Sequence, residues 1–202
     1  PKRPFSPERY FRWRKYWDYS GGIATDLFYH TVSPLLVAIG PEFPHRVTAS
    51  GGIYFQHDRE VPDTFFMNVD YPKWTMQLAC SVGSGVGAPL VIHGSEGTLF
   101  VARDSESLDN TEMEVVPDRD FAEEFKKKTG VEALKIPVTP FARGTHPHMD
   151  NFLECVRTRQ APHLDAETGY RAMAAIGMGV TAYRRNEVLF FDSKRERVTE
   201  TL

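Results

Sequence analysis

The sequence predicts an α+β protein in which helices pack on one face of an open, largely antiparallel β-sheet. Helical periodicity marks the first forty residues and the last third of the chain, and short β-rich segments separated by turn residues fill the region between. Helices, then consecutive strands, then helices are typical of this class. The 202 residues, 41% of them hydrophobic, can bury a sizeable core, so we expect one domain over residues 1–202.

A short helix is expected near the N-terminus. Ser6 followed by Pro7 is typical of an N-cap with proline in the first turn, which predicts a helix from Glu8 to about Lys15. Its charged face is expected in solvent. Its aromatic residues are expected to pack inward: Tyr10, Trp13 and Trp17.

A longer helix is expected after the Gly21-Gly22 pair. Apolar residues recur at helical spacing from Ile23 to Ile39, and Gly40 followed by proline predicts the end of the helix. Pro34 lies inside this run and is expected to disturb its last turns.

The central region predicts a run of strands joined by hairpins. Segments such as "TFFMNVDY", "WTMQLACSV" and "GTLFVAR" are β-rich, and "DYPKW" and "HGSEG" between them have the composition of tight turns. Residues 104–111 are polar and predict an exposed loop. Apolar residues occur at both parities of several strands, so neither sheet face is expected to be freely solvated.

The last third returns to helical patterns. One helix is expected within "HPHMDNFLECVRTRQ", with an apolar stripe formed by Met149, Phe152, Leu153 and Val156. Asp165 is expected to cap a second helix that is rich in small residues, and "EVLFFD" is expected to return to the sheet as a final strand.

Composition argues against several kinds of partner. The formal net charge is −3, so no global positive field would collect nucleic acid, although Arg12 and other basic residues alternate with aromatic ones near the N-terminus. No apolar run has the length of a membrane span. Only Cys80 and Cys155 are present, without metal-type spacing, and both are expected as small buried apolar residues.

Three further motifs favour structural interpretations. "GSGVG" at residues 83–87 lies between strand-like segments, without the helix that a phosphate-binding loop requires. His146, His148 and Asp150 would spread around a helix start, so we predict no metal site. The acidic residues of "HDREVPDT" are interpreted as a turn with local ion pairs.

Asp26 and His30 form the strongest candidate site. They lie four residues apart in the longer predicted helix, so both side chains share one face of an otherwise apolar and aromatic segment. A carboxylate and an imidazole in such surroundings need partners, which favours a lined pocket. Gly21 and Gly22 would allow the backbone to approach a ligand closely.

Several stretches resemble the Gfo/Idh/MocA oxidoreductase family, over nearly the whole chain. "SGGIATDLFYH" resembles its substrate-side motif, "VIHGSEGTLFV" its glycine-containing hairpin and "HMDNFLECVRTRQAPHLDAETGYRAMAAIGMGVTAYRR" its closing helix pair. "RPFSPERYFRWRKYWDYSGGIATDLFYH" and "ASGGIYFQHDREVPDTF" resemble a bacterial branch.

The resemblance implies a C-terminal substrate-binding and oligomerisation domain. The nucleotide fingerprint and the lysine-bearing segment of the family have no match in residues 1–202, so NAD or NADP is expected to bind mainly to an N-terminal domain absent from this chain. This chain alone is then expected to be inactive. Its compartment would be cytoplasmic, or extracytoplasmic if an export signal lies upstream.

The resemblance also implies residue roles. His30 matches the family's basic position and Asp26 its acidic one, so His30 would remove a hydroxyl proton while a hydride leaves carbon for the nicotinamide, and Asp26 would orient substrate or imidazole. The substrate would be a sugar, a polyol or a related hydroxyl compound. Its binding would involve residues of the preceding aromatic and basic segment: Arg12, Trp13, Tyr16, Trp17 and Tyr19.

The sequence leaves two alternative functions open and also predicts an oligomeric state. The alternatives are an NAD-dependent glycosidase of the same fold and a non-catalytic binding or scaffold domain. An apolar sheet face left uncovered by helices predicts a homo-oligomer formed through that face, which is also what the resemblance implies.

Overall fold

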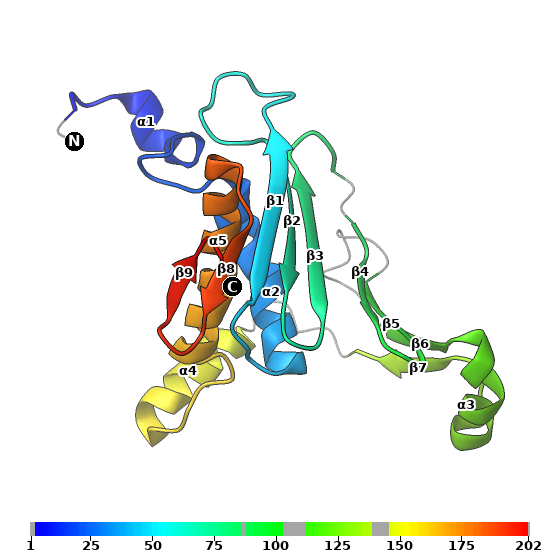
Figure 1. Ribbon diagram of the computed structural model, residues 1–202. Helices are drawn as coiled ribbons and strands as arrows, with labels where there is room; N and C mark the ends of the chain where they lie inside the picture. The colour runs from blue at the N-terminus through cyan, green and yellow to red at the C-terminus, as the bar shows by residue number, and fades with distance from the viewer. Residues whose placement is uncertain (1–2, 86–87, 103–111, 139–145, 202) are drawn as a thin grey trace. The chain divides into compact units, whose positions relative to one another are not determined.

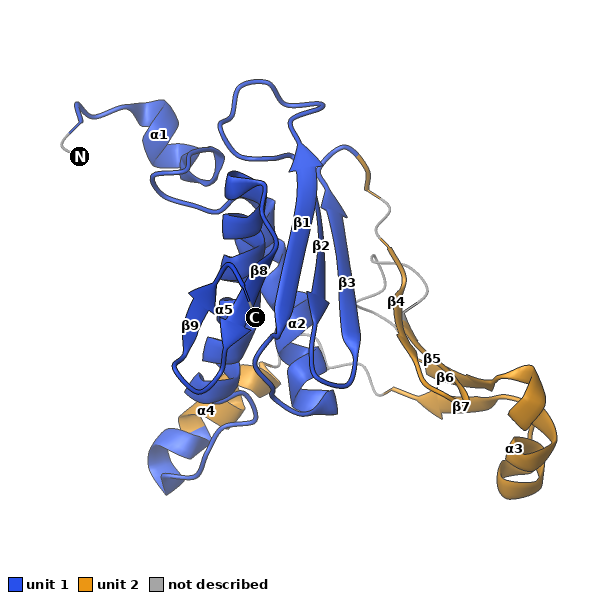
Figure 2. Ribbon diagram, viewed as in Figure 1, with its two compact units in different colours: residues 1–83, 154–202 blue, residues 84–153 orange. Residues whose placement is uncertain are grey.

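The computed structural model describes residues 3–85, 88–102, 112–138 and 146–201, and the chain divides into two compact units (Figure 2). Unit 1 comprises residues 1–83 and 154–202, and unit 2 comprises residues 84–153. Antiparallel strands and helices occur in both, which confirms the α+β class. The predicted loop at residues 104–111 lies outside the described residues.

The N-terminal segment of unit 1 is less regular than predicted. Helix α1 (Pro7–Phe11) is followed by the 3-10 turn η1 (Trp13–Lys15), and the Arg12 backbone between them leaves helical geometry. The Ser6 hydroxyl accepts a hydrogen bond of 3.3 Å from the Arg9 backbone N–H, so the predicted N-cap is confirmed.

The predicted burial of this segment is largely wrong. Tyr10 and Trp13 are exposed, and only Trp17 packs inward, with its ring centroid 6.5 Å from that of Tyr183. Lys15, expected on a solvated face, is buried. The change from an α-helix to a 3-10 turn at Arg12 alters the residue spacing around the axis, so the expected inward face does not form.

Helix α2 (Ile23–Ile39) begins after Gly22 and ends before Gly40, as predicted, with Pro34 inside it. Its buried face includes Phe28, Val32 and Leu36. Asp165 caps helix α5 (Ala166–Arg185) by accepting a hydrogen bond of 2.8 Å from the Thr168 N–H, which confirms that prediction.

Sheet A of unit 1 has five strands in the order β3-β2-β1-β8-β9 (Figure 1). The strands are β1 (Arg46–Gly52), β2 (Thr64–Asp70), β3 (Thr75–Ser81), β8 (Leu189–Asp192) and β9 (Arg197–Thr199). All their pairings are antiparallel, and β8 rejoins the sheet beside β1 as predicted. Helices α2 and α5 contact each other and the strands, and they cover one face.

The two faces of sheet A differ, contrary to the sequence prediction. Phe65, Met67 and Val69 of β2 are buried, whereas Phe66 and Asn68 between them are exposed. The outer face is mainly polar or small, with these residues on β1 to β3: Thr48, Ser50, Asn68, Thr75, Gln77 and Ala79. The strands therefore alternate between an apolar and a polar side, and the expected apolar outer face is absent from the described part of this sheet.

Sheet B of unit 2 has four antiparallel strands in the order β4-β5-β6-β7. They are β4 (Leu90–His93), β5 (Gly97–Ala102), β6 (Glu112–Pro117) and β7 (Leu134–Pro137). The predicted hairpin between β4 and β5 forms, with the Gly94 N–H donating to the Gly97 carbonyl at 2.8 Å.

One face of sheet B is apolar and only partly buried within the described part of unit 2. Register places these residues on that face: Ile92, Leu99, Met113, Val115, Leu134 and Ile136. The opposite face is mixed, because it carries His93, Glu112 and Lys135 together with Val91, Phe100 and Val116. No described residue of unit 2 is buried, so this apolar face has no complete cover within the described part of that unit. The sequence prediction of an uncovered face rests on strands that form sheet A, so sheet B does not confirm it.

The remaining helices are mostly exposed. The short turn η2 (Arg119–Phe121) precedes α3 (Ala122–Thr129), and α4 (Pro147–Thr158) follows β7. The predicted stripe on α4 lies at the surface, with Met149, Phe152, Leu153 and Val156 between 44% and 54% exposed. Within the described ranges, no helix combines the length and apolar character that a bilayer crossing requires.

Candidate active-site surface

Asp26 and His30 both belong to α2 and lie one turn apart, as predicted. Asp26 is half-buried and His30 is exposed, whereas neighbouring Phe28 is part of the core. The candidate pair therefore occupies a solvent-accessible side of α2 and is not enclosed within unit 1.

The glycine pair before α2 serves internal packing in this structure. Gly22 is buried with a φ of +75°, and a Cβ atom at this position would meet the Val61 Cβ at 2.9 Å. Glycine at position 22 thus allows a close approach to the protein's own loop.

Arg14 holds the Asp26 side chain. Its Nε donates a hydrogen bond of 2.7 Å to Asp26 Oδ1, and its guanidinium lies 4.2 Å from the centre of the Trp13 ring. The side chains of Arg14 and Asp26 are 56% and 36% exposed, so the ion pair orients Asp26 and contributes about 1 kcal/mol or less to stability. Sequence reasoning missed Arg14, because a contact across twelve residues between different elements leaves no periodic signal.

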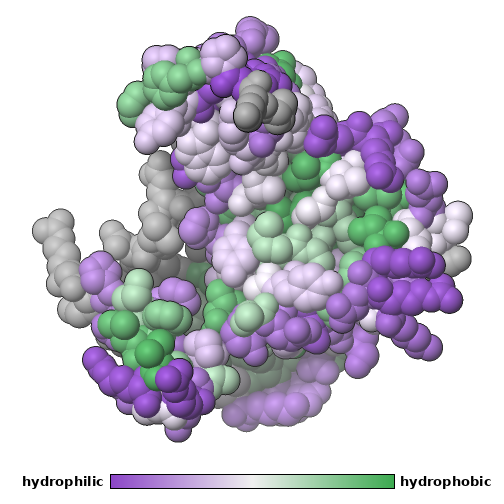
Figure 3. Space-filling model, turned by 90° about the vertical axis from the view of Figure 1, so that its left-hand side faces the viewer, coloured by the Kyte–Doolittle hydropathy of each residue, from purple (hydrophilic) through white to green (hydrophobic). Residues whose placement is uncertain are grey.

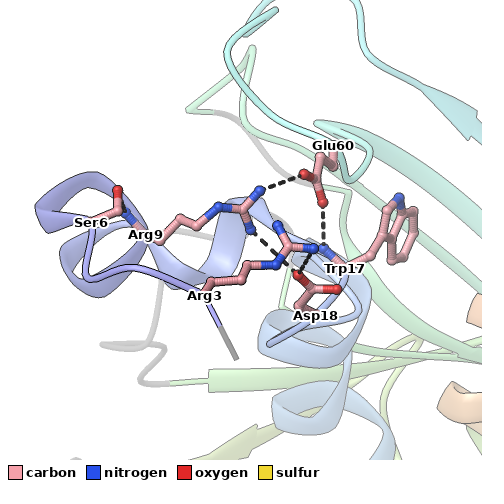
Figure 4. Close-up of polar contacts among 6 residues, drawn as sticks. All are labelled: Arg3, Ser6, Arg9, Trp17, Asp18 and Glu60. Carbon is pink, nitrogen blue, oxygen red and sulfur yellow. Dashed lines mark hydrogen bonds and ion pairs between the residues drawn. The ribbon is translucent and has the colours of Figure 1, made fainter. Parts of the chain in front are cut away.

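Four charged residues tie the N-terminal segment to the loop between β1 and β2 (Figure 4). Asp18 Oδ2 lies 2.8 Å from Arg3 Nη2 and 3.5 Å from Arg9 Nη1. The other Arg9 nitrogen donates to Glu60 Oε1 at 3.0 Å, and Glu60 Oε2 accepts from the Trp17 N–H at 3.2 Å. Two guanidinium groups are thereby balanced by two carboxylates.

Lys15 adds a partly buried contact to the same loop. Its Nζ donates to Asp58 Oδ2, and its carbonyl accepts a hydrogen bond of 2.8 Å from the Glu60 N–H. The Lys15 side chain beside it lowers the pKa of Asp58. The acidic residues of "HDREVPDT" therefore form long-range pairs, and their interpretation as a turn with only local ion pairs is wrong.

Asp63 anchors the other end of this loop. Its buried carboxylate accepts hydrogen bonds of 2.7–3.1 Å from the backbone N–H groups of Tyr54, Phe55 and Gln56. Burial alone would raise the pKa of Asp63, but these donors and the Thr64 hydroxyl outweigh it and lower the pKa to about 2. The loop that contacts the N-terminal segment is thus fixed by a buried negative charge.

The five predicted substrate-binding residues have different surroundings. Trp13 and Tyr19 are exposed and line one hollow of about 440 Å³. Tyr16 lies under the Arg9 guanidinium, 4.0 Å from its ring centre. Trp17 packs against Tyr183, with the guanidinium of Arg184 over its ring at 4.8 Å.

Arg12, the fifth of these residues, is exposed at the junction of α1 and η1. Of the five residues, Trp13 and Tyr19 line the same accessible hollow, whereas Trp17 packs against Tyr183. Seen from the side on which the N-terminal segment lies, hydrophobic residues appear at the surface between hydrophilic ones (Figure 3).

The described residues do not form a dinucleotide cradle at "GSGVG". Gly83 follows β3, a Cβ atom there would collide with the Phe55 ring, and the next element is strand β4. Gly87 and its preceding neighbour lie outside the described residues. His146, His148 and Asp150 are exposed around the start of α4, and in the described part of the chain no group of three or more His, Cys, Asp or Glu side chains is arranged to hold a metal ion.

The sequence matches a family model described as "Oxidoreductase family, C-terminal alpha/beta domain" over residues 2–188. No match is found among curated proteins. Solved structures with the same fold include an NAD-binding protein from Listeria innocua, 18% identical with a TM-score of 0.60, for which the match covers 88% of this chain and 54% of the other.

Two further structures were solved with ligands. An oxidoreductase from Agrobacterium radiobacter in complex with NAD⁺, L-tartaric acid and magnesium is 12% identical, with a TM-score of 0.63 and coverage of 92% of this chain and 53% of the other. The WlbA dehydrogenase from Bordetella pertussis in complex with NADH and UDP-GlcNAcA is 19% identical, with a TM-score of 0.61 and coverage of 93% and 51%. This chain thus spans about half the length of the structures it matches.

Proposed function

Because the chain belongs to the Gfo/Idh/MocA oxidoreductase family as its C-terminal α/β domain, we propose that it forms the substrate side of an NAD(P)-dependent oxidoreductase. The substrate is a sugar, a polyol or a related hydroxyl compound. The observation that carries this proposal is the placement of Asp26 and His30 one turn apart on an accessible side of α2, beside an aromatic segment.

His30 acts as the base in this proposal. Its exposed imidazole accepts the hydroxyl proton of the substrate as the C–O–H group becomes a carbonyl. Asp26, held at Oδ1 by Arg14, orients the substrate hydroxyl or the imidazole and stabilises the protonated imidazole. NAD or NADP, bound by the intact protein, would be the hydride acceptor.

The intact protein with its nicotinamide cofactor provides the test. His30→Ala is expected to lower the rate about a hundredfold or more on a sugar or polyol that the wild type oxidises, because a general base typically contributes that factor. The rate that remains in His30→Ala should no longer fall at acidic pH, because the base whose protonation causes that fall is missing. His45→Ala, at another exposed histidine of unit 1, is the control. A His30→Ala variant with full rate and an unchanged pH profile excludes the proposed base.

Two measurements separate the alternatives: the redox state of the cofactor after turnover, and the biological activity of a variant without Asp26 and His30. An oxidoreductase accumulates NAD(P)H in solution during turnover, whereas a glycosidase that oxidises and then re-reduces its sugar returns the cofactor to its starting state. A scaffold protein would keep its biological activity when Asp26 and His30 are both replaced.

We further propose that the protein is a homo-oligomer. The apolar face of sheet B supports this, because contiguous apolar surface at Leu99, Val115 and their neighbours is seldom left exposed by a soluble monomer. A stable contact of this kind would bury about 2,000 Å² or more in total.

A further inference from the structure

The hollow of about 440 Å³ in the N-terminal segment has a composition suited to a ligand. Its lining includes two guanidinium groups and four aromatic rings, from Arg3, Arg9, Phe5, Tyr10, Trp13 and Tyr19. All four rings are exposed, between 38% for Trp13 and 76% for Phe5. Aromatic faces next to phenol and guanidinium groups can pack against C–H groups and hydrogen-bond hydroxyl groups at once, as a pyranose ring requires.

The charges around the hollow favour an uncharged ligand. Arg3 and Arg9 are both paired with Asp18, and Arg9 also pairs with Glu60, so the two cations face two anions (Figure 4). An anionic ligand would have to compete with these carboxylates, whereas the hydroxyls of a neutral sugar can share the same donors and acceptors.

The same ion pairs give the hollow a fixed frame. Glu60 belongs to the loop whose backbone is fixed by the buried Asp63 carboxylate, and Arg9 also lies over the Tyr16 ring. The Arg9 side chain, which lines the hollow, is therefore held by Asp18, by Glu60 and by the Tyr16 ring. A preorganised wall loses less conformational entropy on binding than a mobile one.

Contacts connect the hollow to the candidate active site. Trp13 lines the hollow, the Arg14 guanidinium lies on the Trp13 ring, and Arg14 donates to Asp26. A ligand in the hollow would thus lie beside Trp13, which contacts Arg14, and Arg14 holds Asp26. Two side chains, Trp13 and Arg14, therefore link the hollow to Asp26.

We propose that this hollow is a subsite for the second sugar ring of a neutral glycoside. The inference rests on the proposed function, since it takes the reacting ring to lie at Asp26 and His30. It narrows the substrate class from sugars and polyols in general to uncharged glycosides with at least two rings.

Binding measurements on the full-length protein test the proposal without requiring turnover. Calorimetric titration would use a panel of neutral disaccharides, cellobiose, lactose and maltose, each compared with the methyl glycosides of its two component sugars. At least one disaccharide is expected to bind about tenfold more tightly than either monosaccharide, and Trp13→Ala is expected to remove that advantage. Phe66→Ala should leave it within twofold, because Phe66 is a 48% exposed ring on the outer face of sheet A that does not line the hollow.

Each outcome decides one part of the proposal. No gain for any disaccharide of the panel, or an equal loss in both variants, overturns the subsite. Tighter, salt-sensitive binding of cellobiouronic acid than of cellobiose overturns the neutral ligand. His30→Ala should lower turnover and keep the disaccharide preference, so a failure of the proposed base and a failure of the subsite give different results.

Discussion

Sheet A and sheet B each have one side that is more apolar than the other, yet only sheet A buries that side fully. In sheet A, Phe65 and Met67 lie under α2 and α5 and are completely or almost completely buried. In sheet B, Leu99 and Val115 occupy the equivalent apolar side and remain only half-buried. Strand patterning therefore decides which side of a sheet is apolar, while the cover for that side depends on other elements or other molecules.

The largest expected effect separates the two faces of β2. Phe65→Ala should lower the free energy of unfolding by about 4 kcal/mol, because it removes a buried ring that contacts Phe28 and Tyr183. Phe66→Ala, one residue away on the outer face, should cost less than about 1 kcal/mol. Urea denaturation of both variants measures the difference. Equal losses would contradict the distinction between the two faces.

The second prediction concerns the apolar face of sheet B. Val115→Lys should weaken self-association at least about a hundredfold, because a charge would be buried in the proposed contact. Val116→Lys, its neighbour on the opposite face, is the matched control and should associate like the wild type. Sedimentation velocity at micromolar concentration measures this. A wild-type protein that stays monomeric without aggregating would count against the proposed oligomer.

A smaller effect is expected at Asp63, the buried carboxylate of the loop between β1 and β2. Asp63→Asn should cost about 2 kcal/mol at neutral pH, because the hydrogen bonds to three backbone N–H groups lose their charge assistance and one acceptor oxygen becomes a donor group. The pKa of Asp63 is lowered in the folded protein to about 2, so its stabilisation is complete above about pH 4 and is lost as pH falls towards 2.

Stability measured between pH 2 and 6 tests this dependence. The wild type should lose more stability on acidification than Asp63→Asn does, so the two curves should converge at the acid end. Parallel curves would exclude Asp63 as a source of acid sensitivity.

The smallest effect is expected on the mixed face of sheet B, which carries Lys135. Lys135 Nζ lies 2.7 Å from Glu112 Oε1, but the two side chains are 64% and 46% exposed. Lys135→Ala should therefore change the free energy of unfolding by less than about 0.5 kcal/mol. A loss above 1 kcal/mol in thermal or urea unfolding would mean that this face is covered in solution.

Local features of the fold could be predicted from the sequence because they depend on neighbouring residues. The end of α2 at Gly40, the Asp165 cap and the hairpin between β4 and β5 are encoded within a few residues of where they occur. The positions of Asp26 and His30 on one helix face are of the same kind, since they follow from helical spacing alone.

Long-range contacts could not be predicted in the same way. The burial of Lys15, its pairing with Asp58 and the contact between Arg14 and Asp26 each join different elements. The error about the outer face of sheet A has a similar origin. Phe66 made the strand look apolar on both sides, although Asn68 and the facing residues of β1 and β3 make that side mainly polar.

The insertion of unit 2 within unit 1 also has consequences for the order of folding. Strands β1, β2 and β3 form consecutive hairpins, whereas β8 reaches β1 only after residues 84–153 and pairs through two positions, Arg46 with Phe190 and Val47 with Leu189. Closing so long a loop is entropically unfavourable until α5 has packed on the sheet. We therefore expect the three-stranded meander to gain protection from hydrogen exchange early during refolding, with β8 and β9 protected last.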